Sequence, residues 1–482
     1  MHTYKGAKLS HPYTHLPSHF FSKVTPTPLE NVRWVDWNEN LALELGLPES
    51  PDGELLDLLS GNSVLDAFPP LAMKYVGHQF GAYNPDLGDG RGLLLFQVDT
   101  DDKSYDIHIK GAGLTPYSRQ GDGRAVLRSS IREYLMSEAL HGLGIPSTRA
   151  LALLTSDTPV YREEIETGAI CVRVATTHIR FGHFEYLYYT NQIDGLKQFS
   201  DFVIDHHFPN ITDEHNPYLA MFQEVVSRTA SMIAKWQSIG FAHGVMNTDN
   251  MSILGETFDF GPFGMMENFD PSFICNHSDY QGRYAFDNQP SIGLWNLTAL
   301  AQALSPLIAK EDLQKTLDTY YTTLTKEYSV LMRNKLGLLE SKPEDTELFN
   351  RLFALMKENQ ADYTNTFRAL SNVDKVGKSA FLAELKNSDS ALDWFSSYQE
   401  RLKSEESNEK LRCNQMRTHN PKYILRNYMA QTAIERAQEG DFSEVKRLKK
   451  LLDFPFDENS GTEEDTKPAP EWAQGLALSC SS

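Results

Sequence analysis

The sequence of 482 residues predicts an α+β protein with a β-rich lobe, a helical lobe and a site where the two join. Short strand patterns and glycine-rich turns fill residues 75–185, around one strong amphipathic helix. From about residue 186 the apolar spacing becomes mostly helical, interrupted by a polar stretch at 243–261 and the loop after it. Residues 310–450 are helical and rich in charge, which predicts a helical extension.

These changes of pattern divide the chain into five expected parts. They are an N-terminal extension (1–60), a β-rich N-lobe with a glycine-rich loop (61–185), a helical C-lobe with the catalytic and metal-binding loops (186–310), a helical C-terminal extension (311–455) and a tail (456–482). The tail contains the acidic, proline-containing run DENSGTEEDTKPAPEW, which is typical of a flexible segment.

The composition excludes several classes of protein. Lys and Arg number 45 against 65 Asp and Glu, a net charge of -20, so we expect neither nucleic acid nor an anionic membrane as a partner. The sequence shows no signal-peptide core and no run of about 18 apolar residues that would span a membrane. The 4 cysteines form no Cys-x-x-Cys pair, which argues against a zinc ribbon. We expect a cytoplasmic monomer.

The first candidate site feature is the segment LGDGRGLLLFQVD at 87–99, where Gly88, Gly90 and Gly92 alternate. A strand follows these glycines, whereas a dinucleotide-binding fold would need a helix there, so the segment predicts a hairpin tip. Glycines at such a tip let the backbone approach phosphates, and Arg91 adds positive charge. An ordinary glycine-rich hairpin turn is the alternative at this point.

The next strand and helix favour the phosphate-binding alternative. YDIHIK at 105–110 alternates strictly, which places Lys110 at the end of a strand on the face that also carries His108. The helix that follows carries Glu133 beside its apolar stripe, in a position to pair with Lys110. An exposed strand lysine and a solvated helix glutamate are the alternatives, and Asp122 could be a simple N-cap of this helix.

Arg173 and Arg180 lie in the strand-rich stretch CVRVATTHIRFGHFE at 171–185. Their planar guanidinium groups are suited to phosphate oxygens, and they are equally suited to structural ion pairs.

The stretch HGVMNTDNMSILGETFDFG at 243–261 resembles the catalytic region of a protein kinase, with Val245 in the place of the catalytic aspartate. We expect MSILGETFDF to fold as a tight hairpin, with Gly255-Glu256 as its turn. The hairpin would bring Asn250 and Asp259 together as oxygen ligands for Mg²⁺. Asp249 could then deprotonate an attacking hydroxyl, or it could be an Asx-turn residue.

Four long segments together resemble the selenoprotein O (SelO) family of kinase-like proteins. They are YVGHQFGAYNPDLGDGRG, HGVMNTDNMSILGETFDFGPFGMMENFDP, CNHSDYQGRYAF and NPKYILRNYMAQTAI, and the resemblance covers nearly the whole chain. It implies a bilobal protein kinase-like fold that binds ATP in a flipped orientation. It also implies transfer of AMP from ATP to Ser, Thr or Tyr hydroxyls of proteins, self-modification included, with UMP transfer from UTP as a further activity.

The resemblance also implies roles for individual residues. Gly88, Gly90, Arg91, Lys110, Asp122, Gly123, Arg173 and Arg180 would bind the nucleotide, with Glu133 pairing Lys110, Asn250 and Asp259 holding Mg²⁺ or Mn²⁺, and Asp249 acting as proton acceptor. Some animal members carry selenocysteine third from the C-terminus, where this chain has Cys480. We hypothesise that Cys480 folds back to Cys275 as a redox switch, the alternative being an exposed tail thiol.

Two other functions are compatible with parts of this pattern. A conventional protein kinase is disfavoured by Val245, which removes the usual phosphotransfer base. A catalytically silent nucleotide-binding scaffold would not need Asp249, Asn250 and Asp259 together with the Lys110–Glu133 pair. We therefore expect a protein nucleotidyltransferase.

Overall fold

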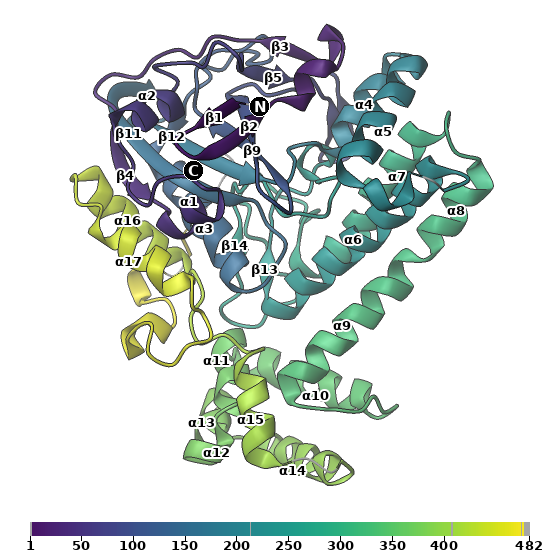
Figure 1. Cartoon of the computed structure of the whole chain (residues 1–482). Coiled ribbons are helices and arrows are strands. Elements are labelled where there is room, and N and C mark those ends of the chain that lie inside the picture. The colour runs from purple at the N-terminus through teal and green to yellow at the C-terminus, as the bar shows by residue number, and fades with distance from the viewer. Residues whose placement is uncertain (1, 213, 406–407, 474, 477–482) are drawn as a thin grey trace.

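The structure, a computed structural model, describes residues 2–212, 214–405, 408–473 and 475–476. Strands between residues 2 and 175 form a ten-stranded antiparallel sheet (Figure 1). Its central strand order is β1-β2-β8-β9-β12-β11-β4. β10 pairs with β12, and β3 pairs with β5, which in turn pairs with β8. The strands of this sheet are β1 His2–Tyr4, β2 Ala7–Ser10, β3 Phe21–Lys23, β4 Arg33–Trp37, β5 Leu71–Met73, β8 Gly92–Asp99, β9 Ser104–Lys110, β10 Ala125–Val126, β11 Arg149–Tyr161 and β12 Ile165–Ala175.

Two small hairpins lie outside the large sheet. β6 (Gly77–Gln79) pairs with β7 (Ala82–Asn84), and β13 (Phe241–Ala242) pairs with β14 (Gly264–Met265). Both are connected to the polar stretch at 243–261. β6 contacts its short helix η4, and the stretch itself joins β13 to β14.

The helices follow the sheet in the chain, apart from two short ones near the start and α3 within it. They are α1 Glu39–Glu44, α2 Gly53–Ser60, α3 Leu127–Gly142, α4 Phe181–Tyr189, α5 Ile193–His207, α6 Pro217–Ile239, α7 Gln289–Leu304, α8 Lys310–Asp318, α9 Tyr320–Leu336, α10 Asp345–Asn359, α11 Tyr363–Leu370, α12 Val373–Val376, α13 Ser379–Glu384, α14 Asp389–Lys403, α15 Glu409–Arg417, α16 Asn427–Gln438 and α17 Ser443–Leu452. Short 3-10 helices are η1 Pro12–His15, η2 Ser18–Phe20, η3 Pro209–Ile211, η4 Thr248–Asn250, η5 Phe286–Asn288, η6 Glu463–Thr466 and η7 Glu471–Ala473.

The α+β class predicted from the sequence is confirmed, and its long helix forms where the pattern places it. α6 begins with Pro217 after the N-cap Asn216, whose side chain accepts a hydrogen bond from the Leu219 amide at 3.1 Å. It ends at Gly240, which adopts a left-handed conformation with φ 74°. The helix therefore delivers the chain directly into β13 and the polar stretch.

The residues expected to form an N-terminal extension are part of the sheet itself. β2 pairs with β8 and β4 pairs with β11, so residues 1–60 supply strands on both sides of the strand that carries Lys110. The helices α1 and α2 pack against the sheet face opposite α3, in a cluster with Ile107, Ile109 and Leu151.

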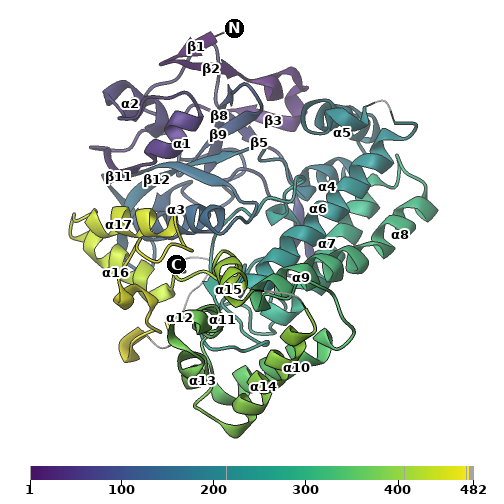
Figure 2. The same cartoon turned by 60° about the horizontal axis from the view of Figure 1, so that its bottom comes forward.

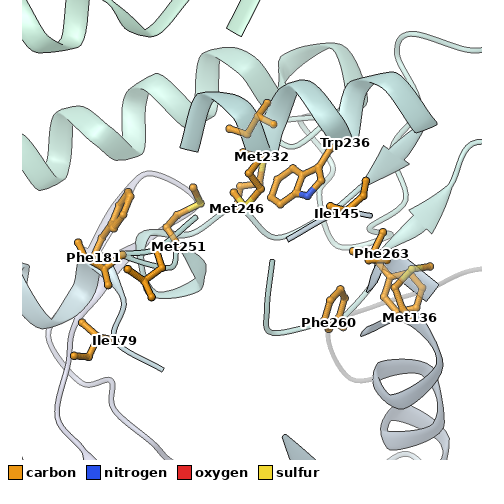
Figure 3. Close-up of a cluster of buried hydrophobic side chains, with 14 of the residues drawn as sticks. Met136, Ile145, Ile179, Phe181, Met232, Trp236, Met246, Met251, Phe260 and Phe263 are labelled. Atoms are coloured by element: carbon orange, nitrogen blue, oxygen red, sulfur yellow. The ribbon is translucent and has the colours of Figure 1, made fainter. Parts of the chain in front are cut away.

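The largest hydrophobic cluster joins the other face of the sheet to the helical part. It includes α3, α6 and the segments on either side of the polar stretch. Figure 3 shows part of it, with Met232 and Trp236 of α6 on one side and Met136 of α3 beside Phe260 and Phe263 on the other. The polar stretch is thus held between two large helices, which fixes the backbone of its buried residues.

The C-terminal helices do not continue outward from α15. α16 and α17 return to α3, as Figure 2 shows, and their buried side chains join the largest cluster. Helices α10, α11, α13 and α14 instead form a third cluster, which also includes the end of α9 and Met266 and Phe269 after β14. The part of the tail up to residue 473 also contacts the body of the protein: the Ala469 amide donates to Glu267 Oε2 at 2.7 Å.

Two local expectations from the sequence are wrong, and one of the alternatives left open there is excluded. The hairpin at 251–260 does not form, because Ser252 bridges to Arg180 and Thr257 bridges to Ser147. The glycines at 88 and 90 do not form a tight hairpin tip, since they end a long connection between β5 and β8 that contains the β6–β7 hairpin. Asp122 does not cap α3, whose N-cap is Val126.

Among the described residues, no helix is both long enough and apolar enough to cross a membrane.

Candidate active site

A buried cluster of ion pairs forms where the sheet meets α3. Lys110 ends β9 between Gly92 of β8 and Cys171 of β12. Its Nζ donates to Glu133 Oε2, and Arg173 Nε donates to Glu133 Oε1 at 2.5 Å. All three side chains are buried, which rules out an exposed strand lysine and a solvated helix glutamate.

The charge of Glu133 is maintained by these two cations. Burial acts to raise the pKa of Glu133, but Arg173 and Lys110 outweigh it and hold that pKa below its usual value. A buried carboxylate shared by two cations fixes the position of both, so Glu133 orients Lys110 and Arg173 toward the same space.

Asp259 extends the same network toward the polar stretch. Arg173 Nη2 lies 2.8 Å from Asp259 Oδ1, and Arg180 Nη1 donates to Asp259 Oδ2 at 2.5 Å. Burial opposes the charge of Asp259, but the arginines outweigh it and hold its pKa far below the usual value. Its backbone adopts φ 61°, an unusual conformation for a residue other than glycine. The sequence left two roles open for Arg173 and Arg180, phosphate binding and structural ion pairs. The structure shows the ion pairs, and both guanidinium groups still face the site.

Arg180 connects Asp259 to the loop that contains Asp249. Its Nη1 also donates to the Asp249 carbonyl oxygen at 2.9 Å. The guanidinium also contacts the rings of Tyr75 and Phe258, with its central carbon 4.5 and 4.7 Å from their centroids. Arg180 therefore replaces the expected hairpin as the element that brings residues 249 and 259 together.

Asp249 is a buried carboxylate with one oxygen that has no hydrogen-bond partner among the described residues, Oδ1. Its Oδ2 accepts from Gln79 Nε2 at 3.3 Å. Burial is the main cause that raises the pKa of Asp249 to about 7. The amide two residues on, that of Met251, donates to the Thr248 carbonyl and not to this carboxylate, so Asp249 forms no Asx-turn.

Asn250 follows directly and is oriented by its own amide. Its Nδ2 donates to the Val245 carbonyl at 3.0 Å, which leaves Oδ1 directed away from that carbonyl. Val245 occupies the position of the kinase aspartate, and its backbone carbonyl holds the Asn250 side chain in place.

The glycine-rich segment lies over this network and is fixed by Asp89. Its carboxylate accepts from the Met73 amide at 3.0 Å and from the Tyr75 hydroxyl at 3.3 Å, and His108 Nε2 lies 3.4 Å away. Gly88 is required because a Cβ there would lie 2.6 Å from the Tyr117 ring. Sequence reasoning missed Asp89, although a carboxylate between two glycines was a visible signal.

The other candidate residues lie at the edge of the site. Arg91 is exposed, and its carbonyl accepts from the Gly111 amide at 2.7 Å. Asp122 pairs with Arg162 at 2.8 Å, and Gly123 approaches Gly113 so closely that a Cβ would lie 2.0 Å from its carbonyl oxygen. The charge of Arg91 interacts with those of Glu133 and Asp259, so Arg91 lies within electrostatic reach of the Lys110 network. Among the described residues, neither Asp122 nor Gly123 forms a hydrogen bond or ion pair with that network.

Of the two cysteines of the predicted redox pair, Cys480 lies outside the described residues. Cys275 is buried, with its Sγ 3.5 Å from the Ala242 carbonyl. It lies beside Gly244, where a Cβ would be 2.7 Å from the sulfur.

The site can bind a polyanion next to a base. Lys110, Arg173 and Arg180 face one region, and two buried carboxylates, Glu133 and Asp259, hold them there. A further carboxylate, Asp249, lies beside them, and its Oδ1 has no hydrogen-bond partner in the described part of the chain. This set fits phosphate binding together with removal of a proton.

Comparisons with known proteins agree with that chemistry. The chain matches the family model described as protein adenylyltransferase SelO over residues 6–453. It is 58% identical to the protein nucleotidyltransferase YdiU of Aliivibrio fischeri (strain ATCC 700601 / ES114) over 473 residues, which are 98% of each chain. Proteins with the same name from Vibrio vulnificus (strain CMCP6) and Vibrio cholerae are 55% and 56% identical, each over 100% of both chains.

Proposed function

This chain belongs to the SelO family of protein adenylyltransferases, and from that membership we propose how its own residues carry out the reaction. The chain is a protein nucleotidyltransferase that transfers AMP from ATP to proteins. One observation carries the proposal for its site: the continuous network from Lys110 through Glu133, Arg173 and Asp259 to Arg180, with Asp249 directly beside it.

We propose that Lys110, Arg173 and Arg180 hold the phosphates of ATP. The three cations face the same region, and burial in a site of low dielectric makes each of them more effective toward an anion. Gly88, Gly90 and Arg91 would cover the nucleotide from the glycine-rich segment, with Asp122 and Gly123 at its edge. The flipped orientation of ATP belongs to this proposal and is supported by the family.

We propose that Asp249 is the proton acceptor. A Ser, Thr or Tyr hydroxyl of the acceptor protein attacks the α-phosphorus, the bond from that phosphorus to the bridging oxygen breaks, and pyrophosphate leaves. The hydroxyl proton passes to Asp249 Oδ1, the oxygen without a partner among the described residues. Gln79 holds the other oxygen and so fixes the direction of the carboxylate.

The oxygen atoms at this position fit Mg²⁺. Asn250 Oδ1 and the Asp259 carboxylate are hard ligands, and an ionised carboxylate can accept more than the two arginine contacts it already has. Asn250 and Asp259 would therefore hold Mg²⁺, or Mn²⁺ in its place, which would neutralise charge on the bound phosphates.

The broader architecture is also part of the proposal. We propose a protein kinase-like arrangement, with lobes at 61–185 and 186–310, because a glycine-rich segment, a strand lysine, a helix glutamate and Asp-Phe-Gly occur in that order. Residues 1–60 would complete the sheet of the first lobe, and the extension at 311–455 and the tail at 456–482 would frame the two lobes. We also propose that the chain acts as a cytoplasmic monomer and that Cys275 and Cys480 form a redox pair.

The transfer is tested with ATP labelled at the α- or the γ-phosphate. We expect α-label on protein, release of pyrophosphate and loss of label in Asp259→Ala, with the exposed Asp287→Ala as the matched control. Label from the γ-phosphate would indicate a kinase, and no label would indicate a silent scaffold. α-Label that persists in Asp259→Ala would contradict the metal assignment. Parallel reactions with labelled UTP test UMP transfer.

A further inference from the structure

A patch of aromatic side chains lies on the surface beside the active site. We call it the aromatic patch, and it consists of His78, Phe80, Tyr83, Tyr189, Arg283 and Trp295. These residues come from the β6–β7 hairpin, the end of α4, the loop before η5 and α7. They are distant in the sequence, so only the fold brings them together.

The members of the patch contact one another as a continuous surface. The His78 ring lies 5.4 Å from Tyr83, 5.9 Å from Tyr189 and 5.3 Å from Trp295 between centroids. Tyr83 and Tyr189 are 4.4 Å apart, and the Arg283 guanidinium lies 4.8 Å from the Trp295 ring centroid. Phe80 joins the patch through Tyr284, whose ring is 5.1 Å away.

The same hairpin forms one wall of the active site. A Cβ on Gly77 would lie 2.9 Å from Asp249 Oδ1, and Gln79 donates to the other oxygen of that carboxylate. The Phe80 amide lies within hydrogen-bonding distance of Asn247 Oδ1, at 3.3 Å, and of the Tyr284 hydroxyl, at 2.9 Å. The hairpin that carries part of the aromatic patch therefore lies directly against the carboxylate proposed to take the proton.

The exposure and charge of the patch indicate a protein partner. Phe80 and Tyr189 are each 43% exposed and Tyr83 is 37% exposed, although aromatic side chains gain most when they are covered. Arg283 lies near the Tyr284 ring, but it makes no ion pair with any carboxylate in the described ranges, and its Nε has no hydrogen-bond partner there. Tyr, Trp and Arg are the residues that supply most binding energy at protein interfaces.

We propose that the aromatic patch binds the acceptor protein as an extended, unfolded segment. Apolar side chains next to the modified hydroxyl would cover Tyr83, Tyr189 and Phe80, and an acidic side chain of the acceptor would pair with Arg283. An extended chain fits because a folded domain would have to insert its hydroxyl past the hairpin to reach the buried Asp249. This inference rests on the proposed function, since it assigns the acceptor to the site where Asp249 takes the proton.

The test compares a protein acceptor with a small one. β-Casein is an unfolded, acidic protein with Ser, Thr and Tyr, and N-acetyltyrosinamide offers a hydroxyl without a peptide segment. The variants are Tyr83→Ala/Tyr189→Ala and, separately, Arg283→Gln, with Tyr321→Ala on α9 as a control that is also exposed. Label transfer from α-labelled ATP, the Kd for ATP, thermal unfolding and oligomeric state are measured for each.

We expect both patch variants to raise KM for β-casein by about ten-fold or more. In both patch variants, as in the control Tyr321→Ala, we expect three quantities to match those of the wild-type protein. These are the rate of transfer to N-acetyltyrosinamide, the Kd for ATP and the unfolding temperature. Wild-type protein that labels neither acceptor overturns the proposed function, whereas wild-type protein that labels only N-acetyltyrosinamide overturns the docking proposal alone. Three results for the patch variants also overturn the docking proposal. The first is an equal loss of label transfer with both acceptors, and the second is no loss with β-casein. The third is a changed oligomeric state, which would assign the patch to contact with a second copy of the chain.

Discussion

Asp89 illustrates how a single residue sets the geometry of the candidate site. It lies between Gly88 and Gly90, and its carboxylate is bonded to the Met73 amide and the Tyr75 hydroxyl. His108, two residues before Lys110 on β9, faces the same carboxylate. The glycine-rich segment is therefore connected to the strand that positions the lysine.

Asp89→Asn tests this positioning role. In the wild-type protein both carboxylate oxygens of Asp89 accept a hydrogen bond, one from the Met73 amide and one from the Tyr75 hydroxyl. The NH₂ group of asparagine cannot accept, so one of these two hydrogen bonds to the glycine-rich segment would be lost. We expect KM for ATP to rise about ten-fold while kcat changes less, because the chemical groups stay in place. Steady-state AMP transfer measures both constants. Asp86→Asn, exposed in the same connection, is the control, and equal effects of the two variants would contradict the role of Asp89.

At the scale of an element, α9 contains a buried cation. Lys335 is 3% exposed, and its ammonium group lies 4.5 Å from the Phe367 ring centroid and 5.5 Å from that of Tyr363. Within the described residues no carboxylate forms an ion pair with it. Burial lowers the pKa of Lys335 to about 7, so folding near neutral pH requires this lysine to give up much of its charge.

Lys335→Met should therefore stabilise the protein in a manner that depends on pH. The unfolded chain binds the lysine proton up to about pH 10 and the folded chain binds it only below about pH 7, so the wild-type penalty shrinks as pH rises between them. We expect the advantage of Lys335→Met in unfolding free energy to fall by up to about 1.4 kcal/mol per pH unit over that range. Urea unfolding at several pH values measures it. Lys326→Met, exposed on α9, should show no such trend.

At the scale of the whole molecule, one junction connects the site to both C-terminal parts. Arg426, before α16, pairs with Asp362 at 2.7 Å and with Glu267 at 3.2 Å. Glu267 follows the Asp-Phe-Gly segment and also accepts from the Ala469 amide of the tail. The helical extension, the returning helices and the tail thus meet at the segment that leads out of the active site.

Loss of this junction should destabilise the molecule strongly. Arg426→Leu leaves Asp362, which is 4% exposed, as a buried carboxylate without its cation. We expect the unfolding free energy to fall by about 3–5 kcal/mol. Chemical denaturation followed by circular dichroism measures the change. Arg436→Leu removes a half-exposed cation from α16 and should cost no more than about 1 kcal/mol, so a similar loss in both variants would argue against the junction.

Local patterns in the sequence were sufficient for much of this molecule. The alternation of YDIHIK determined a strand with Lys110 on one face, and the apolar stripe before Gly240 determined α6. The motifs also determined the family, because their residues occur together in long, specific segments. These features depend on periodicity and on composition within a short stretch of chain, and both can be read without coordinates.

Only the tertiary structure decided how distant residues meet. Ser252 and Thr257 have a good local hairpin sequence, yet each forms an isolated bridge with a distant residue outside the strands. Arg180 then joins Asp249 to Asp259. Two further features also depend on contacts between residues far apart in the sequence. They are the return of α16 and α17 to α3 and the assembly of the aromatic patch. Such contacts are chosen by burial and charge pairing across the whole fold, and these outweigh the local preference that a sequence pattern records.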